Sequence, residues 1–313
     1  MEGVILQKDN DLIDSFTRDC SLRNMSKETV RSYISNLRVF KGFLDEEGLG
    51  LLQVNRNVLK DFILYLREVR KNSQKRIQND FSALNCFYEY MVYEGVVDRN
   101  PVLEVRKRYL RRYKGSDPPG ERKLISVEQM SDLIDSILDP KDKAMAMVLA
   151  KTGVRRGELI RMDLEDVNWE ELSITLKPTP KRSNRLVFFD DECARVLRRW
   201  LEIRPKIAKP EESALFVSEA RNRINRNSVY EAITKWAKRI GLHDPSSPKM
   251  EDHFSPHNFR HWFTTHLIRN GMKREYVKEL RGDARREAID LYNHIDREEL
   301  RKSYSAHVPK LGI

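Results

Sequence analysis

Cysteine is scarce in this sequence of 313 residues. Its three cysteines, Cys20, Cys86 and Cys193, lie far apart and match neither a disulfide framework nor a zinc-binding pair. We therefore expect a reducing compartment and core positions for all three side chains. Glycine and proline are also few, 13 and 12 in number, which leaves little room for long disordered or collagen-like segments.

Long apolar runs are missing as well. No stretch approaches the roughly 18 apolar residues of a membrane-spanning helix. The first nine residues, MEGVILQKD, lack the basic segment and apolar run of a secretory signal. We therefore expect a folded cytoplasmic protein without a membrane partner. Charge of both signs is plentiful, and the net charge of +10 favours a polyanionic partner.

The length suits two domains. Between Asp9 and Glu94 apolar residues recur at intervals of three and four, as in Val30, Ile34 and Leu37, which predicts a bundle of about four helices. Ser26 is the expected N-cap of one of them. After residue 100 the chain becomes basic and then rich in glycine and proline. This composition predicts a helical domain over residues 1–100, a basic linker over 101–122 and a second domain over 123–313.

The second domain has mixed periodicity. Ser126 and Gln129 fit a capping box. Two short β-favouring runs, 172–176 and 186–189, flank a basic segment and predict a hairpin with a long basic tip. The remaining periodicity is helical, at residues 127–138, 141–151, 192–204, 228–240, 256–270 and 274–280. The expected fold class is mainly α with a small β-hairpin or sheet.

Arginine and histidine gather at two places where they suit phosphate chemistry. Arg155 follows Gly153 at the start of a predicted helix, where backbone N–H groups also favour an anion. Glu158 stands one helical turn further on and can form an ion pair with Arg155. His257 and Arg260 are three residues apart, so one helix face can bring both to the same phosphate.

A zinc site is the competing interpretation of the second cluster, because His257 and His261 are four residues apart. Metalloproteases with that spacing carry glutamate directly after the first histidine, and here Asn258 stands there. We expect neither a metal nor a cofactor. His261 is expected to support the site.

The chain resembles the tyrosine recombinase (phage integrase) family. The resemblance rests on Thr152–Leu159 and His257–His261, which look like two arginine-bearing boxes of that family, and on Leu291–His294, which looks like its nucleophile box. It implies a two-domain clamp around DNA and a site-specific recombinase that cleaves and rejoins strands through a 3′-phosphotyrosine on Tyr292. Arg155, His257 and Arg260 would then stabilise the transition state.

The resemblance also implies a lysine on the hairpin tip that protonates the leaving 5′ oxygen. Lys181 is the expected residue, and Lys177 is the alternative, because the alignment needs a one-residue gap.

The family usually has histidine or tryptophan at the position of Asp283, which ends the sequence Leu280-Arg281-Gly282-Asp283. An ionised aspartate cannot donate a hydrogen bond, so it cannot simply replace histidine. Asp283 either accepts from Arg281, His257 or the tyrosine hydroxyl, or another residue has taken the role. Leu-Arg-Gly-Asp is similar to a variant among archaeal members, which implies an archaeal mobile element.

Basic residues at helical intervals are expected to contact DNA phosphates. They are Arg31, Arg38, Lys75, Arg76, Arg106, Lys107, Arg111, Arg112, Lys177 and Arg182. The resemblance implies paired sites on double-stranded DNA, a homo-tetramer on DNA, a monomer free in solution, and a location on the nucleoid. Residues 298–313 are expected to dock on a neighbouring subunit. Two other functions stay open, a DNA-binding protein that has lost catalysis and a type IB-like relaxing topoisomerase.

Overall fold

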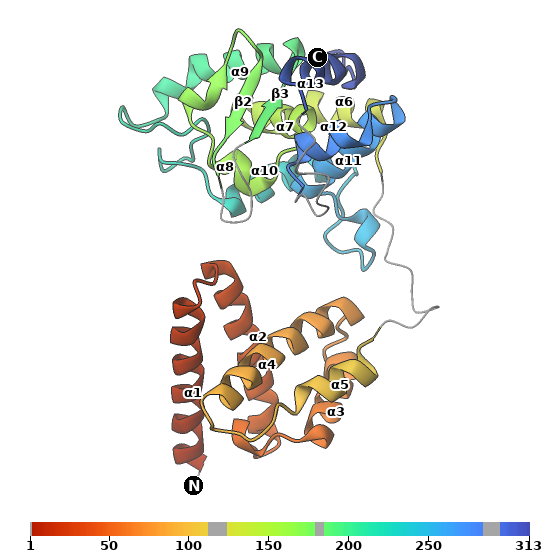
Figure 1. The fold of residues 1–313 in the computed structure, drawn as a ribbon. Coiled ribbons are helices and arrows are strands. Elements are labelled where there is room, and N and C mark those ends of the chain that lie inside the picture. The colour runs from red at the N-terminus through yellow and green to blue at the C-terminus, as the bar shows by residue number, and fades with distance from the viewer. Residues whose placement is uncertain (1, 112–123, 179–184, 284–294) are drawn as a thin grey trace. The chain divides into compact units, whose positions relative to one another are not determined.

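The computed structural model describes residues 2–111, 124–178, 185–283 and 295–313, with side chains from Asp9 onward. The chain divides into two compact units, Met1–Ser116 and Asp117–Ile313 (Figure 1). Each unit has its own apolar core. The three cysteines are buried and unpaired, as expected. None of the helices in the described ranges is long and apolar enough to cross a bilayer.

The first unit is helical throughout its described part. Its α-helices are α1 (Glu2–Leu22), α2 (Lys27–Glu46), α3 (Arg56–Leu64), α4 (Gln74–Tyr93) and α5 (Val102–Tyr109), with a 3₁₀ turn at Leu51–Gln53 and a π-helical turn at Tyr65–Val69. Helix α4 packs against α1, α2 and α5, and its Phe81, Leu84 and Phe87 are fully buried. The predicted N-cap is confirmed, because Ser26 Oγ accepts from the backbone N–H of Thr29 at 3.1 Å.

Helix α5 corrects the predicted linker. Val102, Val105 and Leu110 are buried in the core of the first unit, and Gln78 Nε2 donates to the carbonyl of Leu110 at 2.8 Å. The linker was predicted from the basic residues of this segment. The i, i+3 spacing of the two valines, however, gives the helix an apolar face, which α3 and α4 cover. The segment 102–110 therefore belongs to the helical unit, and a linker can begin only after it.

The second unit combines helices with a small sheet, which confirms the expected fold class. Its α-helices are α6 (Val127–Asp135), α7 (Pro140–Thr152), α8 (Arg156–Ile160), α9 (Asp191–Ile203), α10 (Arg226–Arg239), α11 (Pro256–Arg269), α12 (Arg274–Arg281) and α13 (Arg297–His307). Short 3₁₀ turns lie at Leu164–Asp166, Arg204–Lys206 and Met250–Asp252. The predicted capping box of α6 is present, with Ser126 Oγ and Gln129 Oε1 each accepting from the other residue's backbone N–H.

The sheet is antiparallel with the strand order β1 (Val167–Asn168), β2 (Ser173–Leu176) and β3 (Arg185–Phe188). Strands β2 and β3 form the predicted hairpin, in the register that sets Leu176 opposite Arg185. Strand β1 was not predicted, since two residues give no alternation to detect. The tip residues Lys181 and Arg182 lie outside the described residues.

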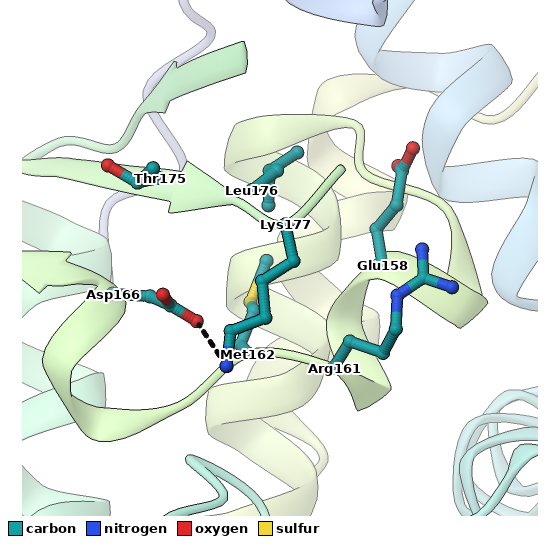
Figure 2. Close-up of a pocket in the computed structure, with 7 residues that line it drawn as sticks. All are labelled: Glu158, Arg161, Met162, Asp166, Thr175, Leu176 and Lys177. Atoms are coloured by element: carbon teal, nitrogen blue, oxygen red, sulfur yellow. Dashed lines mark ion pairs between the residues drawn. The ribbon is translucent and has the colours of Figure 1, made fainter. Parts of the chain in front are cut away.

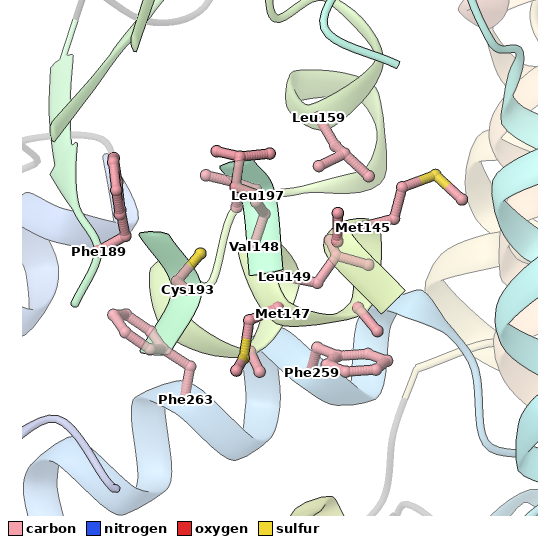
Figure 3. Packing of buried hydrophobic residues seen from close by; sticks show 14 of the residues in the cluster. Met145, Met147, Val148, Leu149, Leu159, Phe189, Cys193, Leu197, Phe259 and Phe263 are labelled. Atoms are coloured by element: carbon pink, nitrogen blue, oxygen red, sulfur yellow. The ribbon is translucent and has the colours of Figure 1, made fainter. Parts of the chain in front are cut away.

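Helix α7 is the centre of the second unit. Every residue from Ala144 to Ala150 is fully buried, as in a helix that neighbours cover on all sides. Figure 3 shows its Met147 and Val148 among Cys193 and Leu197 of α9 and Phe259 and Phe263 of α11. Helix α7 is thus held on both sides, and it ends at the glycine that precedes Arg155.

The C-terminal segment packs on its own unit in this single chain, and its docking on a neighbouring subunit stays a prediction. Leu300, Tyr304, Val308 and Leu311 join the core of the second unit. The Glu192 carboxylate accepts from the backbone N–H groups of Leu311, at 3.0 Å, and Gly312, at 2.7 Å. A carboxylate with two backbone donors and four apolar anchors explain why the segment folds back onto its own chain.

Candidate active site

Arg155 and Arg260 converge on one backbone carbonyl. Arg155 Nη1 donates to the carbonyl of Arg281 at 3.2 Å, and Arg260 Nη2 donates to the same oxygen at 2.8 Å. Arg260 Nη1 donates to the carbonyl of Gly153 at 2.8 Å, which ties α11 to the turn before Arg155. Gly153 has a φ of 60° and ends α7. The structure thus brings together the two arginines that the sequence predicted, and we call them the arginine pair.

Glu158 fixes the position of Arg155, and the predicted ion pair between them is confirmed. Glu158 Oε2 accepts from the backbone N–H of Arg155 at 2.7 Å, and Oε1 lies 3.3 Å from Arg155 Nη1. Arg155 is the N-cap residue of α8, so the carboxylate also satisfies an otherwise unpaired donor at that helix start. Glu158 is buried, which makes the pair part of the interior and not a solvated surface contact.

Arg185 is a third arginine of the site, and it was not among the residues predicted for it. Its guanidinium donates two hydrogen bonds to Glu158, both 2.9 Å long, and its Nε donates to the carbonyl of Leu280 at 3.1 Å. Its exposed fraction is 9%. A charged residue opening a strand of otherwise apolar residues, Arg185-Leu186-Val187-Phe188, was the signal that could have revealed it.

Asp283 lies against three guanidiniums. Its Oδ1 is 3.6 Å from Arg155 Nη2 and 3.4 Å from Arg260 Nη2, and its Oδ2 is 3.1 Å from Arg281 Nε. Of the partners that the sequence left open, Arg281 is therefore one. The contacts of Asp283 with Arg155 and Arg260 were not predicted, because these two arginines were expected to contact only the substrate.

The cluster carries an excess of positive charge. Four guanidiniums share two carboxylates, and these side chains are Arg155, Arg185, Arg260, Arg281, Glu158 and Asp283. Burial, followed by the nearby charge of Arg281, lowers the pKa of Arg260 to about 10. An anion bound at the arginine pair would oppose this shift, so the site favours a phosphate over a neutral ligand.

A cleft of about 490 Å³ opens beside the arginine pair. Its lining includes Arg155, Arg156, Arg226, Tyr230, Ser255, His257 and Arg260. His257 is exposed in the first turn of α11. The predicted arrangement, in which His257 and Arg260 reach the same space from one helix face, is therefore present.

His261 and Asn258 take other places on α11. His261 is exposed, and its Nδ1 lies 3.2 Å from Thr265 Oγ1 on the next turn. Asn258 Oδ1 accepts from the backbone N–H of Ser255 at 3.0 Å and so caps the helix start. Within the described part of the chain, histidine, cysteine and acidic side chains form no group of three that could hold a metal ion.

A match to a family model identifies these features. Residues 123–299 match the model of the phage integrase family, and residues 13–95 match that of the phage integrase N-terminal SAM-like domain. The chain belongs to the phage integrase family. The arginine pair and His257 lie within the first match, at the boxes that the resemblance predicted.

Relatives of this integrase-family chain include recombinases. Tyrosine recombinase XerC of Psychromonas ingrahamii is 28% identical over 306 residues, which cover 96% of each chain. The Tn1549 transposon integrase in complex with transposon right end DNA has a TM-score of 0.68 at 17% identity and covers 94% of this chain and 98% of its own. A lambda integrase dimer bound to a COC′ core site has a TM-score of 0.67 at 13% identity, over 92% and 98% of the two chains. These two structures share the fold.

Lys177, one of the two lysines predicted as the integrase general acid, is held by two carboxylates, of which Figure 2 shows that of Asp166. Its Nζ forms a hydrogen bond with Asp163 and lies 3.7 Å from Asp166. The hydrogen bond to Asp163 raises the pKa of Lys177. A lysine bound in this way is a poor proton donor. Lys181, the first choice, lies outside the described residues.

The expected nucleophile Tyr292 also lies outside the described residues. The next tyrosine along the chain, Tyr304, is described. Tyr304 has an exposed fraction of 1%, and its hydroxyl donates to the carbonyl of Lys151 at 2.9 Å. Burial raises the pKa of Tyr304 well above its ordinary value. Tyr304 is thus a packing residue of the integrase fold, which supports the choice of Tyr292.

Some of the predicted DNA-contacting residues of the SAM-like unit are exposed, and others are bound to side chains of the same unit. Arg31 and Arg38 line a groove on α2 together with Ile34. Arg76 Nη2, in contrast, donates to Asn36 Oδ1 at 2.9 Å and lies 3.2 Å from the buried Asp80.

The others fall into three groups. Lys75, Lys107 and Arg111 are exposed, Arg106 Nη2 donates to Ser82 Oγ at 3.2 Å, and Arg112 lies outside the described residues. Arg31 and Arg38 thus share one groove on α2, whereas Arg76 and Arg106 are held by side chains of their own unit.

Proposed function

We propose that the chain is a site-specific DNA recombinase that cleaves and rejoins strands through a 3′-phosphotyrosine on Tyr292. The observation that carries the proposal is the convergence of Arg155 and Arg260 on the Arg281 carbonyl, beside the cleft that His257 lines. These groups come from distant parts of the sequence and meet inside the part of the chain that matches the family model.

The electrostatics of the site suit this reaction. When a phenolate oxygen attacks a phosphodiester, the phosphorus becomes pentacoordinate and its non-bridging oxygens gain negative charge. The arginine pair and the four charged side chains around it carry four positive and two negative charges. Guanidinium groups fixed by Glu158 and backbone carbonyls can stabilise the added charge without reorganisation. Arg155, Arg260 and His257 would supply these contacts.

Two further steps complete the proposed cycle. Lys181 donates a proton to the 5′ oxygen as its bond to phosphorus breaks, because an alkoxide leaves poorly without one. The 5′-hydroxyl of a partner strand then attacks the phosphotyrosine, re-forming a phosphodiester and releasing the phenol. The phosphotyrosine conserves the energy of the broken bond, so the reaction needs neither a nucleotide nor a metal ion. Glu158 and Arg185 position Arg155, and His261 supports the helix that carries Arg260.

The remaining parts of the proposal concern DNA and assembly. The helical unit binds double-stranded DNA through Arg31 and Arg38, and residues 123–313 form the catalytic domain. The enzyme acts on paired sites as a homo-tetramer that is monomeric without DNA, and it works on the nucleoid, where its substrate is. The Leu280–Asp283 sequence supports an archaeal mobile element, although the XerC relative named above is bacterial.

A covalent trap tests the proposal. Fragments of the source genome are incubated with the protein, denatured adducts are collected, and the 5′ ends of the trapped DNA map the site. A nicked suicide duplex of that site should give an adduct with the natural chain and none with Tyr292→Phe. Tyr93→Phe is the matched control, because Tyr93 is 83% exposed in the other unit. An adduct that survives in Tyr292→Phe would refute the assignment of the nucleophile.

Of two alternatives, the covalent trap distinguishes the first, and relaxation and strand-exchange assays distinguish the second. Asp283 against the arginine pair is the observation that favours a DNA-binding protein without catalysis, which would bind the duplex tightly and form no adduct. A relaxing topoisomerase would form the adduct and relax a supercoiled circle, yet exchange no strands between two duplexes.

A further inference from the structure

In the chain without DNA, the space between the arginine pair holds a carboxylate of the protein itself. Asp283 Oδ1 lies within 3.6 Å of a terminal nitrogen of Arg155 and 3.4 Å of one of Arg260. A phosphate that both guanidiniums bind would place an oxygen in the same space, which we call the anion seat. Two anions in contact repel each other strongly. Asp283 and a bound phosphate therefore cannot occupy the anion seat together.

Arg281 offers the carboxylate another place. Its Nε is buried and has no hydrogen-bond partner among the described residues, although Asp283 Oδ2 is only 3.1 Å away. This distance suits a hydrogen bond, so the N–H of Nε does not point at the carboxylate oxygen. Buried donors without a partner are rare in folded proteins. A rotation of the Asp283 side chain would align its oxygen with this donor and move the other oxygen from the anion seat.

The backbone around both residues is fixed, so only side-chain torsions need to change. The Arg281 carbonyl is held by both members of the arginine pair. Gly282 ends α12 with a φ of 57°, and the backbone N–H of Asp283 donates to the carbonyl of Lys278 at 3.2 Å. A Cβ at Gly282 would lie 2.5 Å from Arg185 Cδ, so the buried arginine packs directly against this turn.

We propose that Asp283 is a resident counter-ion of the anion seat, which the scissile phosphate displaces and Arg281 then receives. Asp283 thereby takes a role unlike that of the hydrogen-bond donor expected at its position. Arg281 is a positioning residue, since it acts on the substrate only through Asp283. The identity of the displacing anion rests on the proposed function, whereas the competition for the anion seat does not.

Binding of inorganic phosphate, followed by ³¹P NMR titration of the full chain, tests the competition. Asp283→Asn removes the resident charge and should bind phosphate about tenfold more tightly, because the anion seat is no longer occupied. Asp283→Ser should show the same gain. Glu219→Gln, an exposed position with the same change in net charge, should bind as the natural chain does. Unchanged or weaker binding in both Asp283 variants would overturn the proposal.

The role of Arg281 needs a double-mutant cycle. Arg281→Gln weakens phosphate binding in any background, because a positive charge is lost. With Asp283 present the loss should be at least about threefold greater than in the Asp283→Asn background, where no carboxylate needs a second partner. Equal losses in the two backgrounds would show that Arg281 does not receive Asp283. Melting temperatures of all variants, measured without phosphate, separate a binding effect from unfolding.

Phosphate titration does not depend on Tyr292, so the two proposals fail separately. If phosphate competes as described and no covalent DNA adduct forms, the resident counter-ion stands and the recombinase proposal falls. If adducts form and Asp283→Asn leaves phosphate binding unchanged, the reverse holds.

Discussion

The guanidinium of Arg185 holds the carboxylate of Glu158 with two hydrogen bonds of 2.9 Å. Its Nε also holds the carbonyl of Leu280, so one buried side chain joins β3, α8 and the end of α12. Glu158 in turn fixes Arg155. The strand that follows the hairpin tip is thereby coupled to the arginine pair, although Arg185 itself contacts no substrate in the proposed reaction.

Arg185→Lys should lower both stability and cleavage. Lysine keeps the charge but cannot form the paired bonds and reach Leu280 as well. We expect a loss of about 2 kcal/mol in the free energy of unfolding, measured by denaturant titration. Adduct formation on the suicide duplex should slow by about tenfold because Arg155 is less well positioned. Arg301→Lys, in an exposed pair with Glu298, should change stability by less than about 0.5 kcal/mol. Similar losses in the two variants would contradict the role of Arg185.

Gly153→Ala should disrupt the turn that presents Arg155. Gly153 has a φ of 60°, and a Cβ there would lie 2.2 Å from Cδ1 of the buried Phe263. We expect a loss of about 3 kcal/mol in thermal or denaturant unfolding, together with loss of adduct formation. Gly42→Ala is the control, since nothing lies within 4 Å of a Cβ in α2, and it should stabilise the chain by about 0.5–1 kcal/mol. A stable and active Gly153→Ala variant would refute this view of the turn.

Local pattern was enough for much of this site, and long-range contact was needed for the rest. The Arg155–Glu158 pair, the capping box of Ser126 and Gln129, and the hairpin all depend on residues near in sequence, so spacing predicted them. The bond from Arg185 to Leu280 joins residues 95 apart, and no local period encodes such a contact.

Two further contacts could not be predicted from local sequence pattern. The basic residues 106–108 led to the prediction of a linker where Val102 and Val105 complete a core. The C-terminal segment contacts Glu192, a buried acid that lies more than 100 residues earlier in the same chain. Neither contact could be predicted without knowing which surface each segment covers.

Lys181→Ala should slow cleavage, and a leaving group that needs no proton should restore the rate. A general acid typically contributes about 10²–10⁴-fold, so we expect a loss in that range on an ordinary suicide duplex. A duplex with a 5′-bridging sulfur at the scissile position should restore the rate, because a thiolate leaves without a proton. Lys177→Ala should show no such repair, since its ammonium group is held by Asp163 and Asp166. Repair in Lys177→Ala alone would exchange the two assignments.

The salt dependence of DNA binding should separate Arg31 and Arg38 from Arg76. Each arginine that neutralises a phosphate adds about 0.9 to the slope of log affinity against log salt. Arg31→Ala and Arg38→Ala should each reduce that slope by about this amount, in anisotropy titrations with a short random-sequence duplex. Arg76 is bound to Asn36 and Asp80, so Arg76→Ala should change the slope less and lower the melting temperature more. Equal slopes in all three variants would place the DNA elsewhere.

Acid should release the C-terminal segment through Glu192. Burial raises the pKa of its carboxyl, but hydrogen bonds from Lys151 and from the backbone of Leu311 and Gly312 outweigh this and leave the pKa below the ordinary 4.5. A group with a lowered folded-state pKa contributes its full stability above the ordinary value and loses it as the pH falls through the folded value. Stability due to Glu192 should therefore hold from pH 7 to about 4.5 and decline below it.

Glu192→Gln should remove the stability that the Glu192 carboxylate contributes. At pH 7 it should cost about 3 kcal/mol, because the fully buried Lys151 loses a charged partner. Its denaturant midpoint should then fall less steeply below pH 4.5 than that of the natural chain. Glu219→Gln, which is exposed, should follow the natural chain at every pH. Parallel acid profiles for Glu192→Gln and the natural chain would show that another carboxylate controls the release, because only the variant lacks the group whose protonation breaks the contacts to Leu311 and Gly312.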